Sequence, residues 1–152
     1  MSAASRAAAG AQTRARVVCI VRGWIGTPYH HQASLKGTGT DCLGLVRGVW
    51  RELYGHDAET PPAYTPDWAE TGGREAMIEA ATRHMIPIAA GDVQEGDVVI
   101  FRLKSGMVAK HAGVMTSAAS FVHAIEGAPV ADVALSPWWR RRIAATFRFP
   151  EV

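Results

Sequence analysis

The order of the hydrophobic patterns along the chain limits the fold more than any other feature. Apolar residues at three- and four-residue spacing predict helices over residues 13–24, 41–54 and 74–85. After Gly91 the pattern changes to short β-branched and aromatic runs separated by Gly, Ser and Pro. These runs predict strands over residues 98–101, 112–115, 121–125 and 143–149. Because helices come first and strands second, we expect an α+β fold in which N-terminal helices pack on a C-terminal antiparallel sheet.

A length of 152 residues fits one domain with a sizeable core. The Ala- and Ser-rich residues 1–12 predict a flexible N-terminal tail, which leaves residues 13–152 as the single domain. Residues 25–40 and the Pro-rich residues 56–73 have no clean hydrophobic period, so we expect a loop and a surface excursion there.

Composition and charge limit the classes of partner that we expect the protein to bind. The net charge is +2, and the one dense basic cluster, residues 140–142, directly follows Trp138 and Trp139. We interpret this cluster as solvated arginines beside two partly buried tryptophans, because a nucleic-acid footprint is normally larger. No stretch approaches the ~20 apolar residues of a membrane span, and the N-terminus lacks the apolar core of a signal peptide. We therefore expect no nucleic-acid or membrane partner and synthesis in the cytoplasm.

The chain has two cysteines, for which the sequence predicts different roles. Cys19 lies within the first predicted helix with no polar residue nearby, which favours a small buried hydrophobe. Cys42 lies at the start of the second helix, where Thr40 or Asp41 can cap the first turn. Backbone N–H groups and the helix dipole lower the pKa of a thiol at such a position, so Cys42 is a candidate nucleophile.

His111 and His123 can supply the base that a thiol nucleophile needs. They lie on two predicted strands joined by a short turn, and a hairpin places such residues close together on one face of the sheet. We assign His111 as general base and His123 as the group that orients it, with the Cys42 backbone N–H holding the oxyanion. On spacing alone, structural roles for all three residues stay open. A zinc site of Cys42, His111 and His123 also stays open, although close ligand pairs are missing.

Several motifs, in order, resemble the NlpC/P60 cysteine peptidases, over about residues 15–149. Those motifs are Gly26-Thr27-Pro28-Tyr29, Gly39-Thr40-Asp41-Cys42-Leu43-Gly44-Leu45-Val46, Glu95-Gly96-Asp97-Val98-Val99, His111-Ala112-Gly113-Val114 and Phe121-Val122-His123-Ala124. The residues around Tyr29 and Cys42 are most similar to short members carried by tailed phages and gene transfer agents. Leu43 and His30-His31-Gln32 depart from the pattern, since many members have Ser and Trp-Gly-Gly there.

The resemblance implies a papain-like α+β core and a role for each site residue. Cys42 matches the nucleophile, His111 the base and His123 the third polar residue. Tyr29 matches a tyrosine that assists the oxyanion or the substrate, and Asp41 an acidic residue associated with recognition of a substrate amine. A packed loop aromatic for Tyr29 and a helix cap for Asp41 are the alternatives.

Three of the four histidines outside the predicted triad have predictions of their own. His31 shares the loop of Tyr29, where it either lines the cleft or packs in the loop. His56 and His84 fall in the Pro-rich excursion and on the third predicted helix, and we expect both at the surface.

The resemblance also implies a function. We expect a thiol hydrolase that cuts stem peptides of bacterial peptidoglycan, commonly between D-γ-glutamate and diaminopimelate, without a cofactor or metal. We further expect incorporation in a phage-like particle, with tail or baseplate proteins as partners and action at the cell wall. An amidase or acyltransferase on the same fold and a catalytically idle tail-tip protein are the alternatives.

Overall fold

A six-stranded antiparallel sheet forms the C-terminal half of the protein in the computed structural model, which describes residues 2–63 and 74–152. The strand order is β3-β8-β4-β5-β6-β7. The strands are β3 (Ile86–Ile88), β4 (Val98–Phe101), β5 (His111–Ser117), β6 (Ser120–His123), β7 (Ala131–Ala134) and β8 (Ile143–Arg148). Every neighbouring pair is antiparallel, as predicted for the sheet.

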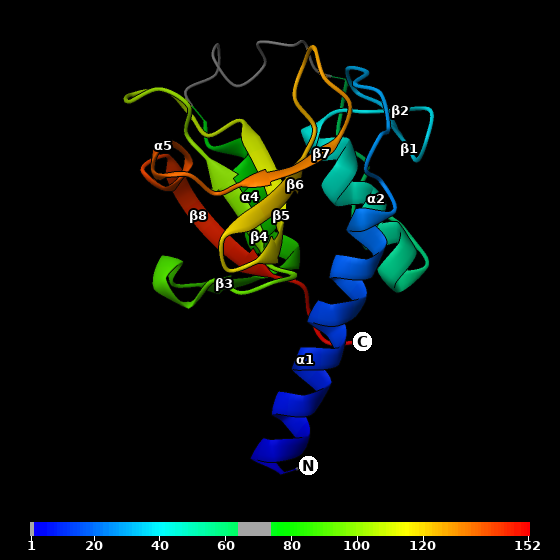
Figure 1. Cartoon of the computed structure of the whole chain (residues 1–152), viewed down its shortest axis with the longest axis vertical. Helices are drawn as coiled ribbons and strands as arrows, with labels where there is room; N and C mark the ends of the chain where they lie inside the picture. The colour runs from blue at the N-terminus through cyan, green and yellow to red at the C-terminus, as the bar shows by residue number, and fades with distance from the viewer. Residues whose placement is uncertain (1, 64–73) are drawn as a thin grey trace.

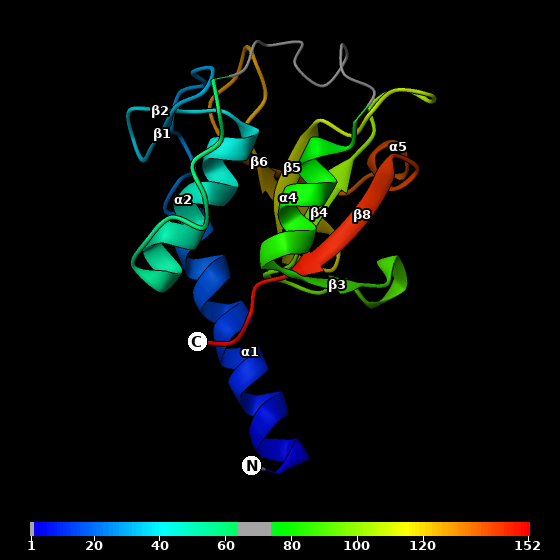
Figure 2. The same cartoon turned by 180° about the vertical axis from the view of Figure 1, so that it is seen from behind.

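Three helices lie on the same side of this sheet (Figures 1 and 2). They are α1 (Ala3–Arg22), α2 (Cys42–Tyr54) and α4 (Ala76–His84). The shorter elements are β1 (Ser34–Leu35), β2 (Gly39–Thr40), the 3-10 helix η1 (Ala90–Asp92) and α5 (Pro137–Arg140). The predicted α+β arrangement, with N-terminal helices on an antiparallel sheet, is therefore confirmed.

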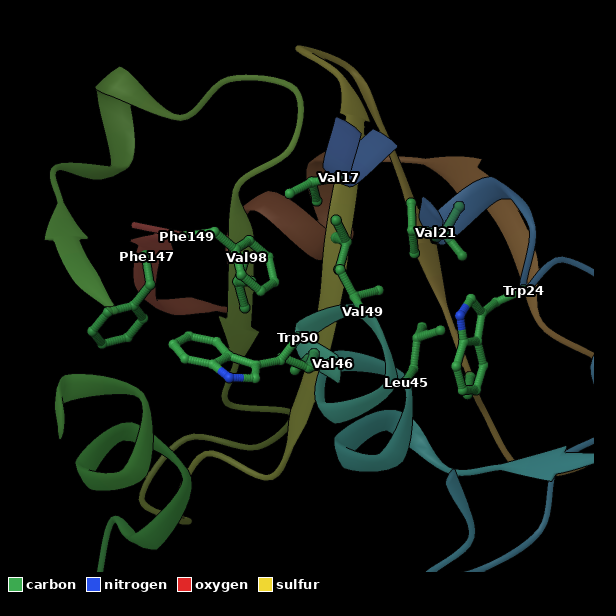
Figure 3. Packing of buried hydrophobic residues seen from close by; sticks show 14 of the residues in the cluster. Val17, Val21, Trp24, Leu45, Val46, Val49, Trp50, Val98, Phe147 and Phe149 are labelled. Atoms are coloured by element: carbon green, nitrogen blue, oxygen red, sulfur yellow. The ribbon is translucent and has the colours of Figure 1, made fainter. Parts of the chain in front are cut away.

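Strand β4 is buried on both faces and separates two hydrophobic clusters. Val98 and Ile100 belong to the main cluster, which the helices cover, whereas Val99 and Phe101 belong to a smaller cluster on the opposite face. This alternation follows from the two-residue period of a strand. Figure 3 shows part of the main cluster, in which side chains of α1, α2 and the sheet meet.

Helix α2 is the element that sequence predicted best. Asp41 caps its N-terminus and Gly55 ends it in a left-handed conformation with φ 84°, which glycine adopts without a Cβ penalty. Gly48 lets α2 pack closely on the turn that follows α1, because a Cβ atom there would lie 2.1 Å from the ring of Trp24. Helix α2 packs against both α1 and β5.

The N-terminal residues differ from the prediction. The segment expected as a tail, residues 1–12, is helical from Ala3, because Ser2 caps the helix and alanine has the highest helix propensity. The first half of α1 extends away from the sheet (Figure 1). Cys19 is exposed, so the prediction of a buried hydrophobe was wrong: the buried valines of this helix, Val17, Val18 and Val21, leave it on the outer face.

Other differences concern short elements. Sequence patterns missed β3, β7 and α5, which are three or four residues long. His84 is half-buried rather than on the surface, since its ring contacts Trp50 edge-on and its Nε2 lies 2.8 Å from Glu59. His56 is exposed as expected. Part of the predicted surface excursion, residues 64–73, lies outside the described residues.

No helix among residues 2–63 and 74–152 has the length and apolar character needed to cross a bilayer.

Candidate active site

The first turn of α2 holds Cys42 at the edge of the loop that precedes it. Asp41 Oδ1 accepts the Gly44 N–H at 2.7 Å, and Oδ2 accepts the Gln32 N–H at 2.7 Å. One carboxylate thus caps the helix and ties the loop of residues 25–40 to it. Gly44 is required there, since a Cβ atom would lie 1.9 Å from the Ala33 carbonyl oxygen. The position of Cys42 is therefore fixed by Asp41, which precedes it in the chain, and by Gly44, which follows it.

The two predicted histidines meet in the sheet. His111 begins β5 and His123 ends β6, and the register pairs Gly113 with His123. His111 Nε2 lies 2.8 Å from His123 Nδ1, a hydrogen bond between two side chains that are each only 5% exposed. The hairpin thus places the rings as the sequence predicted, with one ring positioned to orient the other.

The sulfur of Cys42 lies against the beginning of β5. The thiol donates to the Lys110 carbonyl oxygen at 3.6 Å, and the Ala112 N–H points to the same sulfur. Lys110 and Ala112 are the residues before and after His111. Packing of α2 on β5 therefore brings the predicted nucleophile to the strand position that carries the predicted base.

The electrostatics of the resting site differ from the sequence-based expectation. Burial and the Asp41 carboxylate raise the pKa of the Cys42 thiol to about 12, although backbone N–H groups of Cys42, Leu43 and Ala112 act in the opposite direction. The expected net lowering of this pKa is therefore wrong, because burial, and after it the carboxylate that caps the helix, outweigh the backbone N–H groups of the helix N-terminus.

The histidines are also neutral at rest. Burial and the neighbouring His123 lower the pKa of His111 to about 3, and burial lowers the pKa of His123 to about 4. A neutral thiol therefore lies beside a neutral imidazole pair at physiological pH. His111 is unprotonated and can accept a proton, and its pKa of about 3 makes it a weaker base than an imidazole whose pKa lies near neutrality.

The loop before α2 brings Tyr29 and His31 to the same end of the helix. Tyr29 is half-buried, packs on the main hydrophobic cluster and forms a parallel bridge with Thr40. Burial, and after it the negative charge of Asp41, raise its pKa to about 12, so the hydroxyl is a neutral donor. His31 Nδ1 lies 4.0 Å from Asp41 Oδ2, and its side chain is 31% exposed. Tyr29 thus lies near both Asp41 and Cys42, whereas His31 lies near the Asp41 cap.

The described residues contain no group of three or more His, Cys, Asp or Glu side chains arranged to hold a metal ion.

Comparison with known proteins places this site in a family. The model of the NlpC/P60 family matches residues 26–148, which begin after α1 and end with β8. The chain belongs to the NlpC/P60 family. The match includes Tyr29, Cys42, His111 and His123, so the residues that converge in space all lie within the NlpC/P60 domain.

One curated relative is the gamma-DL-glutamyl hydrolase of Bacillus subtilis strain 168, 30% identical over 129 residues. The match covers 83% of this chain but only 27% of the relative, so the chain spans about a quarter of that protein's length.

Solved NlpC/P60 structures share the fold. The NlpC/p60 domain of the peptidoglycan hydrolase SagA superposes with a TM-score of 0.62 at 20% identity, covering 90% of this chain and 98% of that one. An NLP/P60 family protein of Staphylococcus aureus Mu50 gives 0.65 at 19% identity, covering 93% and 42%. A Bacillus cereus family protein gives 0.64 at 17% identity, covering 90% and 40%.

Sequence reasoning missed one residue that supports the histidine pair of this NlpC/P60 domain. Trp139 on α5 stacks on His111, with ring centroids 5.5 Å apart and an interplanar angle of 28°, and meets His123 edge-on at 5.3 Å. Phe101 and Phe121 complete this aromatic cluster. The only signal was the Trp138-Trp139 pair, of which Trp138 is 44% exposed and carries the Arg142 guanidinium 3.6 Å from its ring centroid.

Proposed function

We propose that this protein is a cysteine-dependent hydrolase that cuts peptide bonds in bacterial peptidoglycan. One observation carries the proposal: within an NlpC/P60 domain, the Cys42 sulfur lies against the residues that flank His111, and the His111 ring is hydrogen-bonded to His123. A thiol, a base and an orienting group in this order are the parts that acyl transfer through a covalent intermediate needs.

The neutral Cys42 thiol and the neutral His111 ring indicate how the first step of the reaction proceeds. His111 takes the thiol proton as the Cys42 sulfur attacks the carbonyl carbon, so that the thiolate is not present in advance. His123 bonds the far nitrogen of His111 and stabilises the imidazolium that forms. His111 then returns the proton to the leaving amine, and a water molecule, activated in the same way, releases the acyl group from sulfur.

The first turn of α2 supplies donors for the oxyanion. The backbone N–H groups of Cys42 and Leu43 point to the sulfur and belong to the first helical turn, where N–H groups have no intrahelical acceptor. Tyr29 adds a neutral hydroxyl on the loop side. Asp41 acts first as the helix cap, and a contact with a substrate amine, aided by His31, is a second role for the same carboxylate.

The bond we propose is the one between D-γ-glutamate and diaminopimelate in a stem peptide. Support comes from the similarity to a gamma-DL-glutamyl hydrolase and from the resemblance of the motifs to those of NlpC/P60 peptidases. The similarity of the segments around Tyr29 and Cys42 to phage and gene-transfer-agent members supports a place in a phage-like particle, acting at the cell wall. Co-purification with tail or baseplate proteins tests that placement.

Digestion of purified sacculi tests the function and the bond. The wild type should release fragments, identified by mass spectrometry, that carry a new γ-glutamyl carboxyl end. Cys42→Ser should release none. Cys19→Ser is the matched control, since Cys19 is the other cysteine and is exposed on α1, and it should digest like the wild type.

Other outcomes identify the alternatives. Fragments that depend on Cys42 but end at the sugar–peptide link indicate an amidase, and transfer of the acyl group to an added amine in preference to water indicates an acyltransferase. The absence of any Cys42-dependent product contradicts the enzyme proposal and favours a structural protein of the tail tip.

A further inference from the structure

Residues 102–110 connect β4 to β5 and lead directly into His111, so they form one side of the candidate active site. The carbonyl group of Lys110, the last of them, accepts the hydrogen bond from the Cys42 thiol at 3.6 Å. The position of this peptide therefore sets where the sulfur lies relative to the His111 ring. The contacts that hold residues 102–110 in place thus bear on the geometry of the reaction.

Strand pairing becomes irregular at this end of the sheet. The bond that closes the β4–β5 ladder, from the Lys110 N–H to the Phe101 carbonyl oxygen, is 3.3 Å long, just beyond the usual range of such bonds. On the other side of β4, the register with β8 shifts between Ile100 and Phe101. The sheet alone therefore does not fix the residues that precede His111.

A carboxylate beside α4 supplies additional support. Glu75 immediately precedes this helix, and its Oε2 atom accepts the Ala109 N–H at 3.0 Å. Its Oε1 atom accepts a hydrogen bond from Arg102 Nη1 at 2.7 Å, and the same nitrogen donates to the Met107 carbonyl oxygen at 3.2 Å. Figure 2 shows α4 on the face of the sheet beside β4 and β5, the strands that this segment joins. One side chain thus holds the segment near both of its ends.

Helix α4 itself does not account for a glutamate at this position. Glu75 occupies the N-cap, where Ser, Thr, Asp and Asn are preferred because their short side chains bond the first free N–H groups. The Glu75 side chain makes no such bond. Instead, its two oxygens bond residues 27 and 34 positions further along the chain. The carboxylate therefore serves the segment before His111 rather than the helix that follows it.

The Ala109 N–H depends on this carboxylate because the residue is buried. Ala109 is 1% exposed and belongs to the main hydrophobic cluster, whereas the Glu75 side chain reaches it from the surface and is 34% exposed. A buried N–H group that loses its acceptor is destabilised, so the backbone shifts toward a new partner. Only Lys110 separates Ala109 from His111, so such a shift displaces the acceptor of the thiol and the base together.

We propose that Glu75 is a positioning residue of the active site: through Ala109 it holds the Lys110 carbonyl group and His111 in the place relative to Cys42 that proton transfer requires. Glu75 acts through the backbone and not on the reacting atoms. Misplacement of a catalytic group by about 1 Å lowers a rate by up to about 100-fold. The role in catalysis rests on the proposed function, whereas the effect on the reactivity of Cys42 does not.

Alkylation of Cys42 by iodoacetamide at neutral pH, with Cys19 replaced by Ser, tests this effect without peptidoglycan. Because His111 accepts the thiol proton, His111→Ala should slow the labelling. Glu75→Ala should slow it by about tenfold. Glu75→Ala combined with His111→Ala should label no more slowly than His111→Ala alone, because a positioning residue acts only through the group that it positions.

Three results of this experiment overturn the proposal. Labelling of Glu75→Ala at the wild-type rate means that residues 102–110 keep their place without the carboxylate. Faster labelling means that Glu75 only shields the sulfur. Effects of Glu75→Ala and His111→Ala that multiply in the double variant mean that the two residues act independently.

Two further substitutions separate positioning from the loss of an ion pair. Glu75→Gln keeps an oxygen that can accept the Ala109 N–H but removes the charge that pairs with Arg102, so it should recover most of the labelling rate. Glu79→Ala is the matched control, because Glu79 lies on the same helix and pairs with the exposed Arg74. It should label like the wild type. A rate in Glu75→Gln as low as in Glu75→Ala contradicts the role assigned to the Ala109 bond.

Kinetics on a soluble stem peptide separates this proposal from the proposed function. Assayed well below its melting temperature, Glu75→Ala should lower kcat about tenfold and leave KM nearly unchanged, because positioning acts on the transition state. A wild-type kcat in Glu75→Ala, with Cys42→Ser inactive, overturns the role of Glu75 and leaves the proposed function intact. If the wild type cleaves no stem peptide but the alkylation rates are as expected, the proposed function fails and the positioning by Glu75 stands.

Discussion

The two sides of the active site are held in place by different physical means. On the helix side, Asp41 fixes Cys42 through hydrogen bonds to the Gly44 and Gln32 N–H groups within one short stretch of chain. On the sheet side, His111 and His123 are held by strand register and by the ring of Trp139. The helix side therefore depends on local polar geometry, and the sheet side on packing between distant segments.

This difference decides which conditions disturb each side. A hydrogen-bonded cap is lost when its acceptor is removed, but it tolerates another side chain with an oxygen in the same place. A buried pair of neutral imidazoles among aromatic rings is sensitive to protonation, because burial disfavours the charged form of each ring. The pair is also sensitive to loss of ring volume, because the cavity left behind destabilises the folded protein. Acid and the substitutions considered next each disturb one side of the active site, and the other side serves as the reference.

Acid should have the largest effect, and it should act on the sheet side. The pKa values of His111 and His123 fall from 6.5 to about 3 and about 4 on folding. Between pH 6.5 and about 4 the unfolded chain therefore binds more protons than the folded protein, and stability falls as the pH falls. The slope is at most about 1.4 kcal/mol per pH unit for each histidine. Denaturant unfolding at several pH values measures it.

Substitution of single histidines shows which residues cause this dependence of stability on pH. His123→Gln should remove a large part of the acid sensitivity, whereas His56→Gln should leave it unchanged, because His56 is exposed to water. An acid slope that is equal in the wild type and in His123→Gln would show that the buried pair is not its source.

Loss of the Trp139 ring is the next largest change. Trp139→Ala should reduce stability by about 2–3 kcal/mol, since it opens a cavity in the aromatic cluster. The neighbouring Trp138→Ala, at an exposed position that contacts Arg142, should cost under about 1 kcal/mol.

The activity of the same variant distinguishes positioning from simple stability. If Trp139 orients His111, Trp139→Ala assayed well below its melting temperature should lower kcat with little change in KM, and Trp139→Phe should recover part of the loss. A kcat equal to that of the wild type in the folded variant would limit Trp139 to a packing role.

The same comparison explains what sequence could predict. The helix side is encoded within fifteen consecutive residues, from the Asp41 cap to the left-handed Gly55, so its pattern is local and visible. The hairpin with both histidines was also predictable, because a short turn sets which strands pair. Trp139 reaches His111 across 28 positions of sequence, and no hydrophobic period reports such a contact.

The sequence pattern could not predict the raised pKa of Cys42 or the short strands β3 and β7. The effect of the helix N-terminus on Cys42 could be predicted, but its reversal depends on burial and on the distance from the sulfur to a carboxylate that also caps the helix. Strand β3 contains Pro87, which is compatible with an edge strand but weakens any strand signal. Strand β7 alternates partly buried and exposed residues and includes two alanines and Asp132, which have low strand propensity.

The smallest predicted effect separates the two roles of Asp41 on the helix side. Asp41→Ala removes the cap and the tie to Gln32 and should cost about 1–2 kcal/mol of stability. Asp41→Asn should recover most of this, because an asparagine oxygen also caps a helix, but it removes the negative charge that raises the pKa of Cys42. The pH dependence of Cys42 alkylation by iodoacetamide, with Cys19 replaced by Ser, should then shift to lower pH. A shift to lower pH with retained stability shows that the carboxylate holds the thiol protonated; an unchanged profile assigns the raised pKa to burial alone.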